Sequence, residues 1–380
     1  APEDQAAPGD PASPVAPAFA PSARSQVPPF TVMTILGRVA ELRAAGRDVI
    51  SLCAGEPGGG APPTVSAAAA EVHASGSPLT YTPALGLPEL RAAVAGHYRR
   101  WYGIDVRPEQ VAITTGSSGA FMLGFLAAFS PGDRVVLPRP GYPAYRNILA
   151  ALGCEVVEVG VDASTRYQPT VAHLEAALAE GPVAGLVLAS PSNPTGTMVD
   201  ADELAALASW CEAHGVRLVS DEIYHGLSYG ERCHSALEVT DEVVVINSFS
   251  KYFSMTGWRV GWMVVPPDHI RTVERLAQNM FICPPHASQV AALAALDCTD
   301  EADANLAVYA ENRRLMLEGL PKAGFHRIAP PEGAFYIYAD ISAMTDDSEA
   351  FCRRMLAETG IAATPGVDFD PARGRHFMRF

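Results

Sequence analysis

The sequence contains almost no lysine. Only Lys251 and Lys322 occur among its 27 basic residues, and all the others are arginine. The formal net charge of −15 argues against nucleic acid as the main partner, and leaves the arginines to bind anions locally. No apolar run is long enough and free enough of charge to cross a bilayer, so we expect no membrane partner.

Paired cysteines are also missing. The seven cysteines are scattered, without the spacing of a metal site or of a disulfide framework, so we predict no bound metal. Their odd number and their place in apolar runs indicate reduced thiols and a cytoplasmic protein. The N-terminus lacks the basic start of a secretory leader, and we expect none.

Composition and length predict a tail followed by two domains. Residues 1–29 are rich in Ala, Pro and Ser and are predicted to form a flexible tail. We expect a small domain built from residues 30–60 and 286–380, and a large domain over residues 61–285. The chain stops at Phe380 within a predicted strand, so we expect that a terminal helix is missing.

Short apolar runs alternate with amphipathic segments in the middle of the chain. The predicted strands are Gln110–Thr114, Arg134–Leu137, Glu155–Val159, Val183–Ala189, Arg217–Ser220 and Glu242–Ile246. The predicted helices are Ala120–Phe129, Tyr145–Leu152 and Asp202–His214, the last capped by Asp200 or Asp202 and ended by Gly215. This alternation predicts an α/β fold with a mostly parallel sheet covered by helices on both faces.

Polar groups follow five of the predicted strands. They are Gly116-Ser117-Ser118, Pro140-Gly141-Tyr142, Pro191-Ser192-Asn193-Pro194, Asp221 with Tyr224, and Ser248 with Lys251. Ligands bind at the carboxyl ends of the strands in such sheets, so we expect one converging site. Each segment alone could be an ordinary turn, because these residue types form turns anyway. Five of them at one edge favour a site.

Lys251 is the most informative residue of this set. It follows the apolar run Val243–Ile246, and a lysine at a buried strand end is costly unless its charge is neutralised or used. An easily desolvated amine is the usual Schiff-base nucleophile toward an aldehyde cofactor. From position alone, a surface lysine just beyond a strand is the open alternative.

The neighbouring residue types complement a particular cofactor. Gly116-Ser117-Ser118 opens a predicted helix, so its free amides and hydroxyls form an anion seat, and Arg259 adds a fork suited to phosphate. Buried Asp221 needs a positive charge such as a protonated ring nitrogen, and Tyr142 can stack on a flat ring. A surface arginine and a core tyrosine are the alternatives for Arg259 and Tyr142. These residues would together bind a phosphate, a flat ring with a protonated nitrogen, and an aldehyde. Pyridoxal 5′-phosphate (PLP) carries all of these groups.

Specific motifs then occur in order along the chain. The most specific is Ser248-Phe249-Ser250-Lys251, followed by Met-Thr-Gly-Trp-Arg-Val-Gly ending at Gly261. Others are Ser192–Gly196, Ser220–Tyr224, Ala54–Pro57, Tyr81–Gly86 with Glu89-Leu90-Arg91, and Glu332–Tyr336. From about Phe30 to its end the sequence resembles the class I/II aminotransferases of the aspartate-aminotransferase fold. The resemblance implies PLP-dependent transferase fold type I, with a seven-stranded type of sheet in the large domain and a smaller α+β domain.

The resemblance also implies roles for single residues. Lys251 would bind PLP as a Schiff base and then act as general base, Asp221 would keep the ring nitrogen protonated, and Tyr142 would stack on the ring. Asn193 and Tyr224 would bond the ring oxygen. The implied phosphate ligands within one subunit are Ser117, Ser118, Ser248 and Arg259. Tyr81 would reach the phosphate of the neighbouring subunit, which implies a homodimer with shared active sites. Arg379 would grip the substrate α-carboxylate, assisted by Gly55 and Asn193.

The implied reaction is ping-pong transfer of an amino group from an L-amino acid to a 2-oxo acid, with 2-oxoglutarate expected. Two departures from relatives bear on the donor: the loop Gly58–Pro63 is glycine-rich, and Asn279–Cys283 lacks an arginine for a distal carboxylate. We therefore expect an apolar or aromatic donor. Another PLP reaction, such as β-elimination (a β-lyase), decarboxylation or ring closure, stays an alternative. A non-enzymatic PLP-binding sensor is disfavoured by the acidic charge and by the presence of Lys251 and Arg379.

Overall fold

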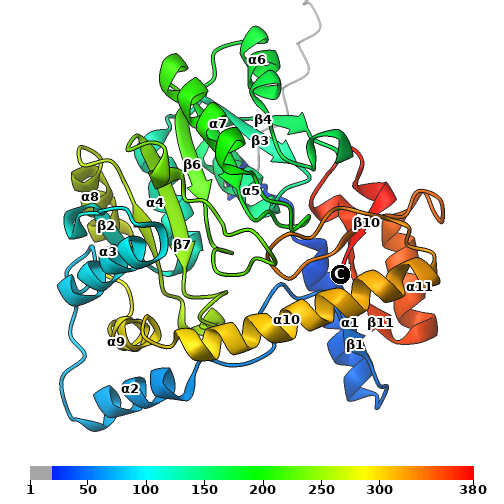
Figure 1. The fold of residues 1–380 in the computed structure, drawn as a ribbon, viewed down its shortest axis with the longest axis horizontal. Helices are drawn as coiled ribbons and strands as arrows, with labels where there is room; N and C mark the ends of the chain where they lie inside the picture. The colour runs from blue at the N-terminus through cyan, green and yellow to red at the C-terminus, as the bar shows by residue number, and fades with distance from the viewer. Residues whose placement is uncertain (1–18) are drawn as a thin grey trace, which may run out of the picture.

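The structure is a computed structural model that describes residues 19–380 (Figure 1). The helices are α1 Thr31–Ala44, α2 Pro63–Ala74, α3 Pro88–Tyr102, α4 Gly116–Ala128, α5 Pro143–Leu152, α6 Val171–Ala179, α7 Ala201–His214, α8 Ile270–Met280, α9 His286–Ala295, α10 Thr299–Gly319 and α11 Ser348–Thr359. The strands are β1 Ile50–Ser51, β2 Val111–Thr114, β3 Arg134–Arg139, β4 Glu155–Gly160, β5 Gly185–Ala189, β6 Arg217–Asp221, β7 Val243–Ser248, β8 Gly261–Val264, β9 Arg327–Ile328, β10 Tyr338–Asp340, β11 Ile361–Ala362, β12 Thr364–Pro365 and β13 Phe377–Arg379. Most of the predicted tail, residues 1–18, lies outside the described part.

A seven-stranded sheet forms the centre of the molecule. Its strand order is β2-β8-β7-β6-β5-β3-β4, and the pairs from β7 to β4 are parallel. β8 runs antiparallel to both of its neighbours, so β2 points the same way as β7. The carboxyl ends of β2, β3, β5, β6 and β7 therefore meet at one edge. The predicted α/β class with a mostly parallel sheet is confirmed.

Both faces of this sheet are covered because its strands alternate between two cores. In β6, Leu218 packs into a cluster with Leu204 and Leu207 of α7, whereas Val219 packs into a second cluster with Phe121 and Leu149 of α4 and α5. Side chains of adjacent strand residues point to opposite faces, which explains this division. Strands buried on both faces read as continuous apolar runs in the sequence.

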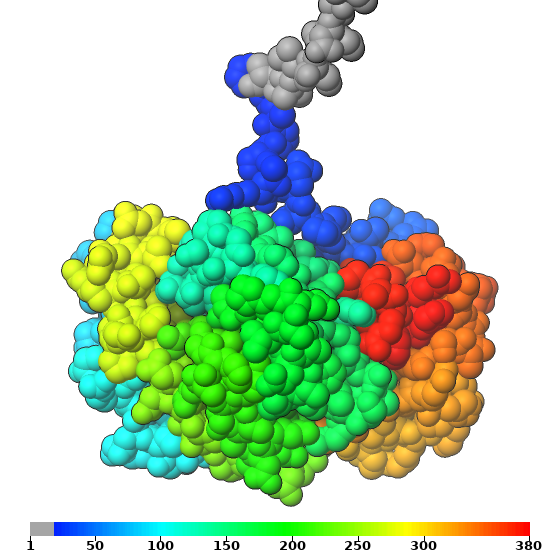
Figure 2. Space-filling model, turned by 90° about the horizontal axis from the view of Figure 1, so that it is seen from above, coloured from blue at the N-terminus to red at the C-terminus, as the bar shows by residue number. Residues whose placement is uncertain are grey.

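The C-terminal part builds a second, smaller layer. Its four-stranded antiparallel sheet has the order β12-β13-β10-β9, and β11 pairs in parallel with β1 near the start of the described chain. Figure 1 shows α1 and β1 beside this layer, with the long helix α10 crossing from one part of the molecule to the other. In Figure 2 the first described residues extend from the surface of the body.

The predicted elements agree with the observed ones within a few residues. Asp200 caps α7 by accepting a hydrogen bond from the Glu203 amide, and Gly215 ends it at φ 65°. The predicted helix over 120–129 in fact begins earlier, at Gly116. Strand β8 was not among the predicted strands.

Three further features concern residues 19–380. None of the helices there is at once long and apolar enough to span a bilayer. Those residues also contain no group of three or more His, Cys, Asp or Glu side chains arranged to hold a metal ion. All seven cysteines are free thiols.

Candidate active site

A cavity of ≈ 930 Å³ opens at the carboxyl edge of the central sheet. The predicted site residues that line it are Gly55, Ser117, Ser118, Tyr142, Asn193, Asp221, Tyr224, Lys251, Arg259 and Arg379. They come from five strand ends and from both ends of the chain, as the sheet topology requires. Ser248 and Tyr81 are the two predicted residues outside its wall.

The Lys251 amine lies inside this cavity and is largely shielded from water. Nζ donates a hydrogen bond to the carbonyl oxygen of Gly55. Burial, and then the positive charge of Arg379, lower the Lys251 pKa to about 8, although Glu56 and Asp221 act in the opposite direction. The lowered pKa increases the unprotonated fraction of this amine near neutral pH, as a nucleophile requires.

Asp221 ends β6 with its carboxylate buried against the cavity. One carboxylate oxygen accepts a hydrogen bond from the Tyr145 hydroxyl and the other accepts from the Ile223 amide at 3.1 Å. Burial raises the Asp221 pKa to about 6, while these hydrogen bonds and the charge of Lys251 lower it. The carboxylate is thus poised to accept a positively charged partner, which would lower its pKa further.

Tyr145 is a site residue that we did not single out from the sequence. It lies three residues after Tyr142, the residue that precedes α5, and the two rings meet edge to face with their centroids 5.4 Å apart. Helical spacing was a signal that could have revealed it. Tyr142 itself can cover a flat ring while Tyr145 holds the acid beneath it.

An anion seat lies at the N-terminus of α4. Gly116 has φ 69°, and a Cβ there would come within 2.4 Å of Arg259 Nη2, so the glycine lets the guanidinium approach the helix end. Ser117, Ser118, Ser250 and Arg259 all line this part of the cavity. Free amides at a helix N-terminus together with an arginine suit a phosphate group.

Ser248 is buried behind the seat rather than exposed to it. Its hydroxyl lies 2.9 Å from Ser250 Oγ and 3.2 Å from the Val260 carbonyl oxygen. Ser250, which the sequence did not suggest, lies in the cavity wall instead. The assignment of Ser248 to a phosphate stays a prediction.

Arg379 is held in β13 and is only 5% exposed, although it is next to the chain end. Its guanidinium donates to Asn193 Oδ1 and to the Cys53 carbonyl oxygen, both at 2.7 Å. The ring centroids of Tyr336 and Phe369 lie 4.4 and 4.6 Å from Arg379 Cζ. The guanidinium forms part of the cavity wall, so an anion bound in the cavity would meet a fixed positive charge with a planar set of donors.

Tyr336 lies close to both Tyr224 and Gly55. We gave this residue no role from the sequence. The hydroxyls of Tyr224 and Tyr336 share a hydrogen bond of 2.7 Å. A Cβ on Gly55 would overlap the Tyr336 hydroxyl, so a larger residue there would have to displace the tyrosine. The Gly55 carbonyl oxygen accepts the hydrogen bond from Lys251.

The residues in this wall fit PLP. The anion seat suits the phosphate, Tyr142 a flat ring, Asp221 a ring nitrogen and the Lys251 amine an aldehyde. The Arg379 guanidinium in the wall suits a second anion, a substrate carboxylate. Such an arrangement can bind an amino acid beside the cofactor and move protons between them.

Comparisons with known proteins agree with this geometry. A family model described as aminotransferase class I and II matches residues 47–378. The chain therefore belongs to this family, whose members are PLP-dependent enzymes that transfer amino groups, and the aminotransferase activity and PLP cofactor expected from the sequence are confirmed.

Individual relatives cover nearly the whole chain. A valine–pyruvate aminotransferase of Mycobacterium tuberculosis is 53% identical over 94% of this chain and 92% of its own. The crystal structure of an aminotransferase from the same organism superposes with a TM-score of 0.92 at 52% identity, over 95% of this chain and 94% of that one. The Thermus thermophilus aspartate aminotransferase with maleate gives a TM-score of 0.88 at 33% identity, with the same coverage.

Replacing Tyr145 with phenylalanine is expected to change the acid limb of the pH–rate profile. The substitution removes a hydrogen bond that favours the ionised Asp221, so the pKa of Asp221 rises and activity is lost at higher pH than in the parent enzyme. A hydrogen bond to a charged group is worth roughly 1.5–3 kcal/mol, which corresponds to about one pH unit or more. Steady-state rates between pH 5 and 9 measure it, and an unmoved limb would contradict the role of Tyr145.

Proposed function

We propose that this enzyme transfers the amino group of an aliphatic L-amino acid such as valine to a small 2-oxo acid such as pyruvate. One observation carries the proposal. Among the described residues, the cations that line the cavity are Lys251, Arg259 and Arg379. The first two would serve the cofactor, which leaves a single arginine of this chain for the α-carboxylate and no cation of its described residues for a distal one.

An apolar part of the cavity wall supports an aliphatic side chain. Phe30, Val32, Met33 and Leu36, from the start of α1, line the cavity. Asp368 fixes this helix end by accepting hydrogen bonds from the Thr31 and Val32 amides at 2.7 and 2.9 Å. An apolar wall held in place favours an uncharged donor and penalises a buried carboxylate.

Within this proposal the chain's own residues divide the work. PLP supplies an electron sink for the carbanion that forms when the substrate loses its α-proton. Lys251 would hold the cofactor through its aldehyde and carry the proton, and Asp221 would keep the ring nitrogen protonated. Asn193 and Tyr224 would donate to the ring oxygen, and Tyr142 would cover the ring. Arg379, with Gly55 and Asn193 beside it, orients the substrate carboxylate.

We also propose the homodimer with shared sites. Tyr81 is 77% exposed and lies outside the wall of its own chain's cavity. The exposed apolar side chains Leu79, Met280 and Ile282 belong to the same two segments, which the 3.0 Å contact of His286 Nδ1 with the Thr80 carbonyl oxygen brings together. An apolar patch around an unused tyrosine supports a partner subunit there.

We also propose two domains, with the second boundary later in the chain than the sequence led us to expect. Residues 286–298 contain α9, whose Gln289 side chain accepts from the Leu87 amide at 2.8 Å and donates to Thr82 at 3.0 Å. This helix therefore packs with the large domain. We place the division at α10, which begins at Thr299, rather than at residue 286.

A donor and acceptor panel tests the proposal. L-Valine, L-phenylalanine and L-aspartate are each paired with pyruvate and with 2-oxoglutarate, the acceptor expected from the sequence. We predict the highest kcat/KM for valine with pyruvate and the lowest values for aspartate. A preference for aspartate would overturn the proposed substrate class.

Val32→Arg gives a sharper form of this test. The new cation lies in the apolar wall, so we expect kcat/KM for valine to fall by about 10- to 100-fold while that for aspartate rises. Thr34→Arg is the matched control, because it adds the same charge to α1 outside the cavity wall. Equal effects of the two variants would mean that α1 does not contact the donor side chain.

A further inference from the structure

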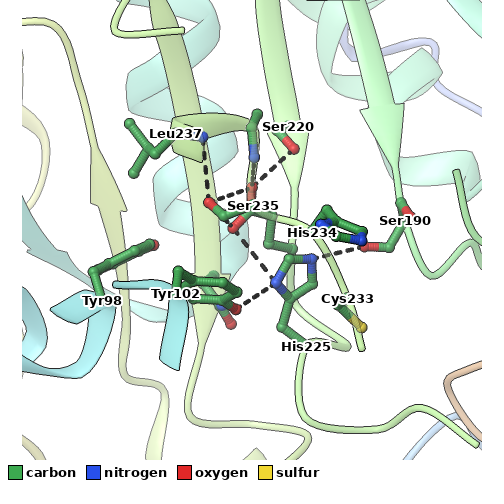
Figure 3. Close-up of polar contacts among 12 residues, drawn as sticks. Tyr98, Tyr102, Ser190, Ser220, His225, Cys233, His234, Ser235 and Leu237 are labelled. Atoms are coloured by element: carbon green, nitrogen blue, oxygen red, sulfur yellow. Dashed lines mark hydrogen bonds and ion pairs between the residues drawn. The ribbon is translucent and has the colours of Figure 1, made fainter. Parts of the chain in front are cut away.

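His225 is buried behind the active-site cavity, at the junction of three segments (Figure 3). Its Nε2 lies 3.0 Å from the carbonyl oxygen of Ser190, the residue that follows β5. Its Nδ1 lies 2.6 Å from the hydroxyl of Tyr102, the last residue of α3. His225 itself belongs to the loop after β6, and it does not line the cavity.

These two contacts fix the tautomer of His225. A carbonyl oxygen can only accept, so Nε2 carries the proton and Nδ1 accepts from the Tyr102 hydroxyl. Burial lowers the His225 pKa to about 3, so the ring is neutral at working pH. The charged or titratable groups that face it are Glu222, 3.6 Å from Nδ1, and Arg232, His234 and Glu238.

Glu222 fixes the other side of the loop after β6 through a second set of hydrogen bonds. The Glu222 carboxylate accepts from Ser220 Oγ at 3.2 Å, from Ser235 Oγ at 2.9 Å and from the Ala236 amide at 2.8 Å. The loop after β6 is thus attached to β6 and to the segment before β7 through Glu222. Among the described contacts, its side-chain link to the loop after β5 is His225.

This link joins two segments of the active site. Ser190 lies three residues before Asn193, and His225 directly follows Tyr224. We infer that His225 is a positioning residue that sets the spacing of Asn193 and Tyr224 through its hydrogen bond to Ser190. The inference rests on the proposed function, in which these two side chains donate to the ring oxygen of PLP.

The inference has a spectroscopic consequence. Donors to the ring oxygen stabilise its negative charge and so lower the proton affinity of the nearby nitrogen that Lys251 contributes. If the spacing of Asn193 and Tyr224 is lost, these donors move out of line and that nitrogen holds its proton to higher pH. The pH midpoint of the visible absorbance of bound PLP reports this change without any turnover.

Two substitutions separate the two ring nitrogens of His225. His225→Gln places an amide donor where Nε2 was, and so preserves the bond to Ser190. His225→Asn places an acceptor near Nδ1, and so preserves only the bond from Tyr102. In the PLP-loaded full chain we expect His225→Asn to raise the absorbance midpoint by about half a pH unit or more, and His225→Gln to leave it close to that of the parent. If His225→Asn does not fold, His225→Phe, which keeps a ring without donors, takes its place.

Tyr224→Phe distinguishes failure of this inference from failure of the site assignment. If Tyr224→Phe raises the midpoint but the two His225 variants give equal midpoints, His225 is not a positioning residue and the proposed function stands. Equal losses of thermal stability in the two His225 variants, with unchanged midpoints, would overturn the inference in the same way. If Tyr224→Phe leaves the midpoint unchanged, the proposed role of Tyr224 fails and the inference fails with it.

Discussion

Replacing Lys251 with alanine is expected to lower turnover by about 10⁴-fold or more, because the proposed function assigns one amine the roles of both nucleophile and general base. The protein should still fold and bind PLP. The anion seat and Asp221 are intact in this variant, and burying a methyl group costs less than burying a partly charged amine.

Borohydride reduction makes this prediction specific to one residue. In the parent enzyme we expect one PLP per chain to be fixed on the peptide that contains Lys251, and in Lys251→Ala none. Lys322→Ala is the natural control, since Lys322 is the second of the two lysines and lies in a surface turn away from the cavity. Label on Lys322 would refute the assignment of the nucleophile.

Asp221→Asn should have the second largest effect. An amide cannot keep the ring nitrogen protonated by its charge, and removing one partner of a buried ion pair costs about 3–5 kcal/mol, or roughly 10²- to 10⁴-fold in rate. We expect this loss in removal of the substrate α-proton, with PLP affinity nearly unchanged because the phosphate seat is untouched.

Stopped-flow measurement with L-valine, with and without an α-deuteron, tests this prediction. In Asp221→Asn a larger isotope effect than in the parent is expected, because proton removal becomes the slow step. Asp370→Asn is a useful control, as Asp370 is also buried in an ion pair, with Arg139 at 3.0 Å, but is outside the cavity wall. Near-normal rates in Asp221→Asn would mean that Asp221 does not face the ring.

The convergence of these residues on one cavity could be predicted from the sequence because strand ends carry a strong local signal. Lys251, Asp221 and Asn193 each lie within five residues of the end of an apolar run, and the parallel topology brings these strand ends to one edge. Arg379 was also expected to lie in a strand. In the structure it pairs with Tyr338 on one side and with Thr364 on the other, so the backbone at this position is held by two neighbouring strands.

Other features depend on tertiary contacts that have no local pattern. β8 is antiparallel and only four residues long, and its sequence follows Arg259 without a turn signal of its own. Whether Ser248 or Ser250 faces the cavity depends on the turn of the backbone after β7. Tyr336 forms a hydrogen bond with Tyr224, although the two residues are 112 positions apart in the sequence.

A single half-reaction tests the central claim, that this chain is an aminotransferase for aliphatic amino acids. The PLP-loaded enzyme is mixed with L-valine and no acceptor, and the cofactor and products are identified. The account predicts conversion of the cofactor to pyridoxamine phosphate with one equivalent of 3-methyl-2-oxobutanoate and no ammonia. Unchanged PLP accompanied by ammonia or carbon dioxide would contradict it.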